Sequence, residues 1–346
     1  MILLLGWLCA GAAVAETLRI GTFHTELSRK GPGLLLRDIL KGDPQAEAVA
    51  EVVAHVAPDV LILQGVDYDH GQATLGALRD LIGAAGVDYP HIFALQPNSG
   101  MASGHDLDGD GRLGEPEDAQ GYGWFAGEGG MAVLSRFPVM AEDVQDFSAM
   151  LWADLPGGIA DDGMNVAVQR LSSVGHWVVP VKVGDKRVNL LTFHATPPVF
   201  DGPEDRNGRR NHDEIAFWQR YLDGAFGHLP EGAFVLAGNA NLDPVDGEGR
   251  KDAIAGLLDD PRLQDPAPRR AGAAGQGAGQ TGDPALDTVA WSAPTPGHLR
   301  VSYVLPAAGL EVTGAGVFWP GEGDPLAAAA RTASRHRVVW VDLRIE

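Results

Sequence analysis

Cysteine is almost absent from this chain, which has a single thiol, Cys9, in 346 residues. One thiol cannot close a disulfide within the chain, so internal covalent cross-links are excluded as a source of stability. Stability must then come from a buried core, and 45% hydrophobic residues with 21% charged residues are typical of a folded protein that can build one. The composition therefore predicts a folded protein and not a disordered one.

The apolar start of the chain is too short to cross a bilayer comfortably. Residues 1–15, MILLLGWLCAGAAVA, fall below the roughly 20 residues that a spanning helix needs. They end in Ala13-Val14-Ala15, the small-x-small pattern of a signal-peptide cleavage site. We expect a signal peptide at 1–15 and a periplasmic or extracellular protein with no stable membrane span. Because no Lys or Arg precedes the apolar residues, a buried N-terminal helix is the alternative.

Basic residues are also scarce, with 26 Lys and Arg against 46 Asp and Glu, a net charge of −20. This charge opposes the approach of a polyanion, so small phosphorylated or phosphodiester partners are favoured over long nucleic acid. One basic cluster, Arg206, Arg209 and Arg210, is a candidate substrate-binding group, since guanidinium groups can bind a phosphate through two parallel hydrogen bonds. The alternative is an exposed helix start that only meets solvent.

The order of apolar segments predicts one α/β domain. Strands are expected at 18–23, 60–63 and 92–95, alternating with helices at 44–56 and 71–82, which is typical of parallel strand pairing. Further strands follow at 131–135, 166–171, 176–183 and 187–193, and a helix is expected at 211–222. Gly184-Asp185 predicts a hairpin between the last two of these strands.

Four apolar runs end in polar residues, at 190–214, 234–243, 298–306 and 334–343. Functional side chains commonly follow strand ends, because loops there are held by a rigid sheet. These segments come from distant parts of the chain. They predict one site at the rim of a sheet and argue against a split into two domains.

Seven short motifs resemble, in this order, those of the endonuclease/exonuclease/phosphatase family, which includes deoxyribonucleases, inositol-phosphate phosphatases and sphingomyelinases. They are LRIGTFH at 18–24, PDVLILQ at 58–64, GGMAVLSRFPV at 129–139, TFHATPP at 192–198, GNAN at 238–241, RVSYVLP at 300–306 and SRH at 334–336. The resemblance implies one domain over 17–346, built as a four-layer α/β/β/α sandwich of two packed mixed sheets flanked by helices. It also implies hydrolysis of phosphomonoesters or phosphodiesters with a divalent metal, Mg²⁺ or Mn²⁺.

Three residues match the catalytic positions that the resemblance implies. His194 would contact the scissile phosphate, Asn241 would orient it, and His336 would act on the attacking water. Five positions depart from the family pattern. The family has Asn at the position of His24, Glu at Gly65, and Asp at Asn239, Ser302 and Arg335.

The lost carboxylates bear directly on the metal, because Mg²⁺ is held by hard oxygen ligands. Asn239 can still coordinate weakly through its amide oxygen, and His24 would favour a softer metal such as Zn²⁺ or Mn²⁺. Asp67 is a further candidate ligand, since alternate residues of a strand share a face and it follows Gly65 at roughly 6–7 Å. For His24, a plain packing role is equally open.

A second metal-binding pattern lies at Asp106–Glu117, DLDGDGRLGEPE, which matches the twelve-residue calcium loop. The expected ligands are the carboxylates of Asp106, Asp108, Asp110 and Glu117 and the carbonyl of Arg112. Glycines on both sides break helices, so we expect a calcium-stabilised insertion around 104–121 and not a sensor with paired helices. An exposed acidic loop without an ion is the alternative.

Two hypotheses of function follow. The first is an exported, metal-dependent phosphohydrolase in which His194, Asn241 and His336 act on a phosphoester. The second is a family member with impaired catalysis that binds a phosphate-bearing ligand, or serves as a calcium-stabilised surface protein. The missing carboxylates favour the second, and the intact histidines favour the first.

Overall fold

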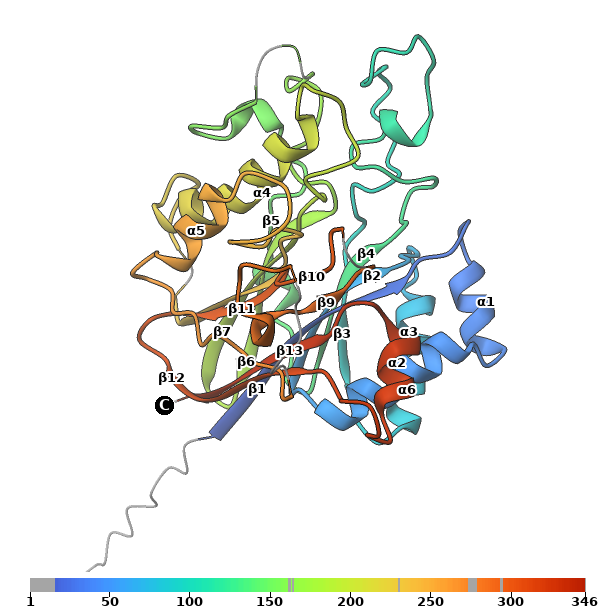
Figure 1. Ribbon diagram of the computed structural model, residues 1–346, viewed down its shortest axis with the longest axis vertical. Coiled ribbons are helices and arrows are strands. Elements are labelled where there is room, and N and C mark those ends of the chain that lie inside the picture. The colour runs from blue at the N-terminus through green and yellow to red at the C-terminus, as the bar shows by residue number, and fades with distance from the viewer. Residues whose placement is uncertain are drawn as a thin grey trace, which may run out of the picture.

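The computed structural model describes residues 16–160, 163, 165–229, 231–272, 279–292 and 295–345. The expected signal peptide at 1–15 lies outside these residues. Two large sheets dominate the described chain (Figure 1). In the part of the chain that the structure describes, no helix is both long enough and apolar enough to cross a membrane.

The first sheet has six strands in the order β12-β13-β1-β2-β4-β3. Its strands are β1 (Glu16–Leu27), β2 (Val60–Val66), β3 (His91–Phe93), β4 (Gly130–Ser135), β12 (Glu311–Phe318) and β13 (Val338–Ile345). Strands β1 and β2 run parallel, and the other neighbours are antiparallel. All seven residues of β2 are buried, as expected for a strand covered on both faces.

The second sheet has five strands in the order β11-β8-β7-β6-β5. They are β5 (Gln145–Asp146), β6 (Gly175–Val183), β7 (Lys186–His194), β8 (Ala233–Asn239) and β11 (Ser302–Pro306). Strands β6 and β7 form the predicted hairpin, and β7 runs parallel to β8. A small separate ladder joins β9 (Val289–Ala290) to β10 (His298–Leu299).

Three apolar clusters define the layers. One lies between the sheets and contains Val60 and Ile62 from β2 with Val188 and Leu190 from β7. The opposite face of the first sheet packs against α1 (Leu34–Leu40), α2 (Pro44–Val56), α3 (Ala73–Ala84) and α6 (Ala327–Ala333). The outer face of the second sheet packs against α4 (Arg206–Leu222) and α5 (Asp252–Leu258). Figure 1 shows these two helix groups on opposite sides of the strands, which gives the predicted α/β/β/α sandwich.

Local signals explain where α2 begins and ends. The carboxylate of Asp43 accepts a hydrogen bond from the backbone N–H of Ala46 at 2.9 Å, and Pro44 occupies the first helical position. The helix stops at Ala57, which has a left-handed conformation and is followed by Pro58. The chain then enters β2, as the sequence predicts.

The expected strand at 166–171 is wrong. The backbone N–H groups of Val168 and Gln169 both donate to the carbonyl of Asn165, so a turn forms there. The carbonyls of Arg170 and Leu171 accept hydrogen bonds from the side chain of Arg210 on α4. Because turn and side-chain hydrogen bonds occupy these backbone groups, the segment makes only an isolated bridge at Arg170.

Candidate functional site

Strand ends from both sheets meet at one rim of the sandwich. His24 of β1 pairs in register with Gln64 of β2, and His194 of β7 pairs with Asn239 of β8. Ser302, which begins β11, is the antiparallel partner of the same Asn239. Parallel strands end at the same edge, and antiparallel partners begin there, so distant motifs come together as predicted.

Three histidines form the centre of this rim. The rings of His24 and His336 are stacked with centroids 4.4 Å apart, and His24 meets His194 edge-on at 4.8 Å. Trp291 meets His336 edge-on, with ring centroids 5.6 Å apart. His194 and His336 are buried. Of the three, the sequence predicted His194 and His336 as catalytic residues and His24 as a weak metal ligand.

Two asparagines complete what we call the histidine–asparagine cluster, which comprises His24, His194, His336, Asn239 and Asn241. The side-chain nitrogen of Asn241 lies 3.4 Å from Nε2 of His194 and donates to the carbonyl of Ala195 at 2.9 Å. The Asn239 amide oxygen accepts from the backbone N–H of Asn241 at 3.0 Å, and its nitrogen donates to the Asn241 oxygen at 3.2 Å. Asn241 therefore lies beside His194, and the ring of His24 lies between His194 and His336.

Burial keeps the three imidazoles neutral. Removal from water lowers the pKa of His24 to about 3, with repulsion from His336 as the next cause. The pKa values of His194 and His336 are also held well below the usual range, again mainly by burial. Nδ1 of each ring is buried without a hydrogen-bond partner among the described residues. Buried polar atoms of this kind are costly unless a ligand or water meets them.

The predicted contribution of Asp67 to a metal site is not realised. One of its carboxylate oxygens accepts the backbone N–H of Arg29 at 2.8 Å, and the other accepts that of Gly129 at 3.0 Å. Burial raises the pKa of Asp67 to about 6. Asp69 is used locally as well, because it accepts the first N–H groups of α3. Both carboxylates are therefore bonded to backbone N–H groups, and no hydrogen bond joins either of them to the clustered histidines.

Residue 65 has no room for the carboxylate that the resemblance implies. Gly65 has a φ of 70°, and a Cβ built on it would lie 2.8 Å from Cε1 of His24 and 3.2 Å from its Nδ1. The ring of His24 thus covers the backbone of residue 65. Strand pairing shifts register here on both sides of β2, which is a β-bulge at the rim.

The cluster does not fit the hard divalent cation of the resemblance. Its possible ligand atoms belong to three imidazoles and two amides, and the buried hydroxyl of Ser302, the strand partner of Asn239, has no hydrogen-bond partner within the described residues. Mg²⁺ and Ca²⁺ require several carboxylate, carbonyl or water oxygens, and the cluster itself contains no carboxylate. Among the described residues, one group of His, Cys, Asp or Glu side chains has ligand atoms close enough to share a metal ion, and it lies elsewhere.

Arg335, which stands where the resemblance implies an aspartate, turns to Glu26. Its backbone N–H and its Nε each donate to the Glu26 carboxylate at 2.7 Å. The hydroxyl of Ser334 lies within hydrogen-bond distance of both that carboxylate and the carbonyl of His24, which share its one proton. The same hydroxyl accepts the backbone N–H of His336 at 3.0 Å. These bonds tie the turn carrying His336 to the end of β1.

The three arginines of the predicted substrate-binding group hydrogen-bond to other parts of the protein. Arg210 donates to the backbone carbonyls of Leu171, Gln120 and Arg170 and is buried. Arg206 donates to the carbonyl of Leu107 and to the side chain of Gln169, and Arg209 donates to the carbonyl of Ile159. All three guanidinium groups therefore hold loops to α4, and their spacing in sequence did not reveal those distant acceptors.

Two other residues of α4 support the site and were missed. Asn211 donates to the carbonyls of Thr196 and Ala240, which belong to the loops carrying His194 and Asn241. Glu214 accepts the N–H of Thr196 and bonds Ser173, whose hydroxyl reaches the carbonyl of His194. Their spacing of three residues on the buried face of the helix, beside Ile215 and Trp218, was the available signal.

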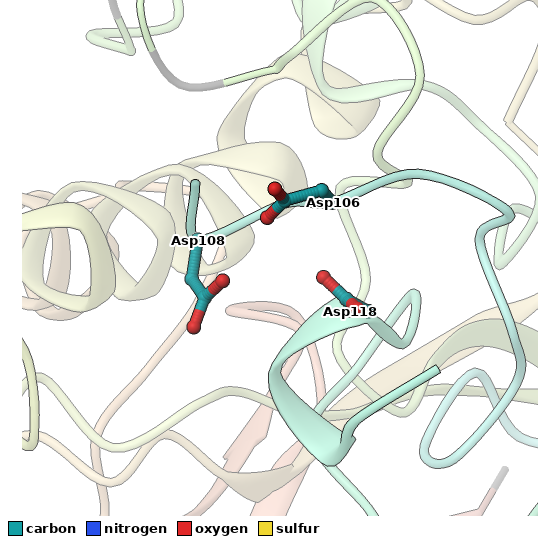
Figure 2. A group of neighbouring side chains, drawn as sticks. All are labelled: Asp106, Asp108 and Asp118. Atoms are coloured by element: carbon teal, nitrogen blue, oxygen red, sulfur yellow. The ribbon is translucent and has the colours of Figure 1, made fainter. Parts of the chain in front are cut away.

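The acidic loop, residues 106–118, brings together carboxylates different from those of the twelve-residue pattern. Figure 2 shows Asp106, Asp108 and Asp118 facing one another, with one ligand oxygen of each lying within 4.8 Å of the others. Asp118 stands where Glu117 was expected, because the 3₁₀ turn at Pro116–Asp118 turns it inward and buries it. This group could hold a metal ion.

The remaining predicted calcium ligands are engaged in the loop itself. Asp110 accepts the backbone N–H of Arg112 at 2.8 Å, and the Arg112 guanidinium pairs with Glu115 at 3.2 Å. Asp106 accepts the N–H groups of Gly109 and Gly111, which curls the loop around its first carboxylate. The grouped carboxylates therefore include Asp118 and do not include Glu117 or Asp110.

Comparison with known proteins agrees with this architecture. The sequence profile of the Endonuclease/Exonuclease/phosphatase family matches residues 28–336. A solved family structure from Beutenbergia cavernae has a TM-score of 0.55 at 19% identity and covers 95% of this chain and 72% of its own. One from Leptotrichia buccalis has a TM-score of 0.54 at 14% identity, covering 95% and 100%. Identity this low shows a shared fold, and no protein of curated function matches the sequence.

Proposed function

Because this chain belongs to the endonuclease/exonuclease/phosphatase family, we propose that its histidine–asparagine cluster binds the phosphoryl group of a small phosphoester without a divalent metal. Enzymes of the family generally hydrolyse phosphoesters, and they typically use such a metal. The proposed ligand belongs to the same class as the substrates of the family, but no cation takes part in binding it. It follows the second of the two sequence hypotheses, a family member with impaired catalysis.

The observation that carries this proposal is the group of three neutral imidazoles, with Asn241 beside His194, whose Nδ1 atoms are buried without a hydrogen-bond partner among the described residues. A neutral imidazole has one N–H donor, and the oxygens of a phosphoryl group are mainly hydrogen-bond acceptors. Several donors gathered from three rings and an amide suit an anion that accepts several hydrogen bonds. The same set lacks the hard oxygen donors that a Mg²⁺ ion requires.

Hydrolysis remains a second candidate because His194, Asn241 and His336 converge as the first hypothesis requires. His336 is neutral and can accept a proton from water, while His194 and Asn241 would hold the phosphoryl oxygens. Arg335 stands where the family has the aspartate that would pair with His336. The guanidinium of Arg335 is itself bonded to Glu26. A strong general base is therefore missing, and we expect slow turnover at most.

Binding and turnover are best measured on the same protein. We expect calorimetry in EDTA to detect inorganic phosphate and p-nitrophenyl phosphate binding, with at least a tenfold loss of affinity in His194→Ala. Arg209→Ala, at the surface of α4, is the matched control and should bind as the parent does. Assays with bis-p-nitrophenyl phosphate, inositol phosphates and DNA should show no stimulation by Mg²⁺, Mn²⁺ or Ca²⁺. Metal-stimulated turnover that His194→Ala abolishes would restore the first hypothesis.

We also propose that the acidic loop binds Ca²⁺ through Asp106, Asp108 and Asp118. The support is the grouping of their oxygens and the bonds that curl the backbone around Asp106. Three carboxylates match the preference of Ca²⁺ for oxygen ligands, and its flexible coordination tolerates an irregular loop. The ion would fasten the segment between β3 and β4.

Export is the third part of the proposal and rests on the sequence pattern at residues 1–15. Expression of the full chain in a Gram-negative host, followed by fractionation and N-terminal sequencing, tests it. We expect the periplasmic protein to begin after Ala15. Retention of the intact N-terminus in the cytosolic fraction would contradict export.

A further inference from the structure

We infer that His24 sets the ligand class of this site by occupying the space beside residue 65, so that the cluster accepts an anion and excludes a divalent cation. The anion half of this inference rests on the proposed function. The exclusion of metal rests on packing alone and is tested separately.

The first support is the contact between His24 and Gly65. A side chain at residue 65 would begin with a Cβ 2.8 Å from Cε1 of His24, closer than real Cβ atoms approach carbon. The same backbone has a φ of 70°, which L residues with a side chain rarely adopt. A metal-binding carboxylate at residue 65 therefore requires both removal of the ring and a change of the bulge.

The second support is the way His24 is fixed. Its ring stacks on His336 and meets the edge of His194, while its backbone carbonyl accepts the hydroxyl of Ser334. The ring cannot swing away from Gly65 without breaking this packing. His24 is thus a structural part of the rim and not a loose surface side chain.

The third support is the set of hydrogen bonds made by the nearby carboxylate of Glu26. Glu26 lies two residues beyond His24 in the bulged end of β1, with a φ of 54°. It accepts the backbone N–H and the guanidinium of Arg335 and the hydroxyl of Ser334. Attraction to Arg335 holds the pKa of Glu26 below its usual range against the effect of burial. The carboxylate of Glu26 is therefore neutralised by an ion pair with Arg335 and is not a free ligand beside the imidazoles.

Four proteins test the inference: the parent, Gly65→Glu, His24→Asn and the double variant. All carry Asp106→Asn and Asp118→Asn, so that the acidic loop contributes no metal binding. Mn²⁺ binding is followed by the paramagnetic resonance of free Mn²⁺, and stability by thermal unfolding. We expect no Mn²⁺ binding by the parent, and at least tenfold tighter binding by the double variant than by either single variant.

Stability provides a readout that does not depend on metal. Gly65→Glu should lower the melting temperature by more in the parent than in the His24→Asn background, because the closest contact of the new Cβ is with the ring, while its 3.1 Å contact with the backbone N of Glu26 is common to both backgrounds. Should Gly65→Glu fail to fold, Gly65→Ala in the two backgrounds replaces it, since its Cβ meets the same ring atoms. Equal losses in the two backgrounds would overturn the inference. So would stoichiometric Mn²⁺ or Zn²⁺ binding by the parent that His24→Asn removes.

The anion half is measured with inorganic phosphate in EDTA. His24→Asn should weaken phosphate binding about tenfold, and an unchanged affinity would remove His24 from the ligand-binding role. If the parent binds no phosphate at all, the proposed function fails. The Mn²⁺ binding and the melting temperatures would then still decide whether His24 excludes a metal ion.

Discussion

Burial decides the charge of the clustered histidines more than their neighbours do. For His24, His194 and His336 alike, loss of water is the largest cause of the lowered pKa, and repulsion from nearby imidazoles or guanidinium groups adds to it. Neutral rings can donate and accept hydrogen bonds without repelling one another strongly. Protonation of one ring would place a positive charge against a ring stacked at 4.4 Å.

A pH dependence of stability follows for His24. Its pKa is about 3 in the folded state and roughly 6.5 in the unfolded chain, so only the unfolded chain takes up the proton between these values. Its contribution to stability is therefore complete above about pH 6.5 and declines as the pH falls toward about 3. His24→Asn should reduce the pH slope of the unfolding free energy by about 1.4 kcal/mol per pH unit in this window.

Urea unfolding at several pH values between about 5 and 7.5, on the parent and on His24→Asn, measures this difference in slope. Asp67 and Asp287 act in the opposite direction, because burial raises the pKa of each to about 6 and the folded state then gains stability as the pH falls. Both carboxylates are present in each protein, so the difference isolates His24. Parallel slopes would show that the ring is already charged or exposed in the folded state.

At the scale of elements, α4 joins the two loops that carry the site. Asn211 connects the loop after β7 to the loop after β8, and Glu214 holds Thr196 and Ser173 on either side of His194. Burial raises the pKa of Glu214 above its usual value. The backbone N–H groups that donate to its carboxylate act in the opposite direction but do not cancel this rise. The start of α4, which the sequence suggested as a ligand-binding segment, thus hydrogen-bonds to the protein's own backbone.

Asn211→Ala should lower both the stability of the fold and the phosphate affinity of the cluster. It removes one amide and leaves the carbonyls of Thr196 and Ala240 without their donor, which typically costs about 1–3 kcal/mol in a buried setting. Because the loops of His194 and Asn241 lose their connection, phosphate affinity should fall more than in a variant of equal stability elsewhere. Gln264→Ala, which also removes an amide bonded to two carbonyls, is the matched control.

Chemical denaturation and phosphate calorimetry on both variants supply the comparison. If both variants lose stability but only Asn211→Ala loses phosphate affinity, Asn211 holds the two loops in the geometry that the site requires. If both variants bind phosphate equally well, Asn211 has a structural role without influence on the site.

The acidic loop gives a second prediction at the scale of elements. Asp118→Asn should abolish most of the rise in melting temperature on adding Ca²⁺, because its carboxylate belongs to the grouped oxygens. Glu117→Gln is the matched control and should retain that rise, since Glu117 lies outside the group. Thermal unfolding with Ca²⁺ and with EDTA decides between them. Loss of the calcium effect in Glu117→Gln alone would favour the twelve-residue pattern.

Much of this arrangement was predictable, and the exceptions have physical reasons. Apolar runs ending in His194 and Asn241 indicated strand ends, and the parallel pairing of β7 with β8 brings such ends together. The place of the His24 ring over Gly65 depends on a β-bulge, which no apolar periodicity encodes. The partners of Arg210 are carbonyls far away along the chain, so its spacing from Arg206 carried no information about them.

For the whole molecule, the site is assembled from both ends of the chain. β1 supplies His24, and the turn before β13 supplies His336, while the second sheet supplies His194 and Asn241. An apolar layer joins the two sheets beneath this rim. Ligand binding at the cluster should therefore stabilise the entire fold, because it links residues that separate on unfolding.

The charge of the whole molecule makes a last prediction about salt. A net charge of −20 repels an approaching phosphate, and salt screens that repulsion over roughly 10 Å at about 0.1 M. The affinity for a small phosphoester should therefore hold or rise as salt increases from about 0.05 to 0.2 M. Proteins that neutralise DNA phosphates with lysine and arginine instead lose about 10³-fold or more over this range.

Calorimetry of inorganic phosphate and of a DNA duplex at three salt concentrations tests the sign of this dependence. Buried guanidinium groups on α4 are already bonded to carbonyls, so they are not free to release counterions from a polyanion. We expect a flat or rising affinity for phosphate and no measurable DNA binding. An affinity that falls steeply with salt would show that a basic surface dominates recognition, and the neutral cluster would then not be the principal binding site.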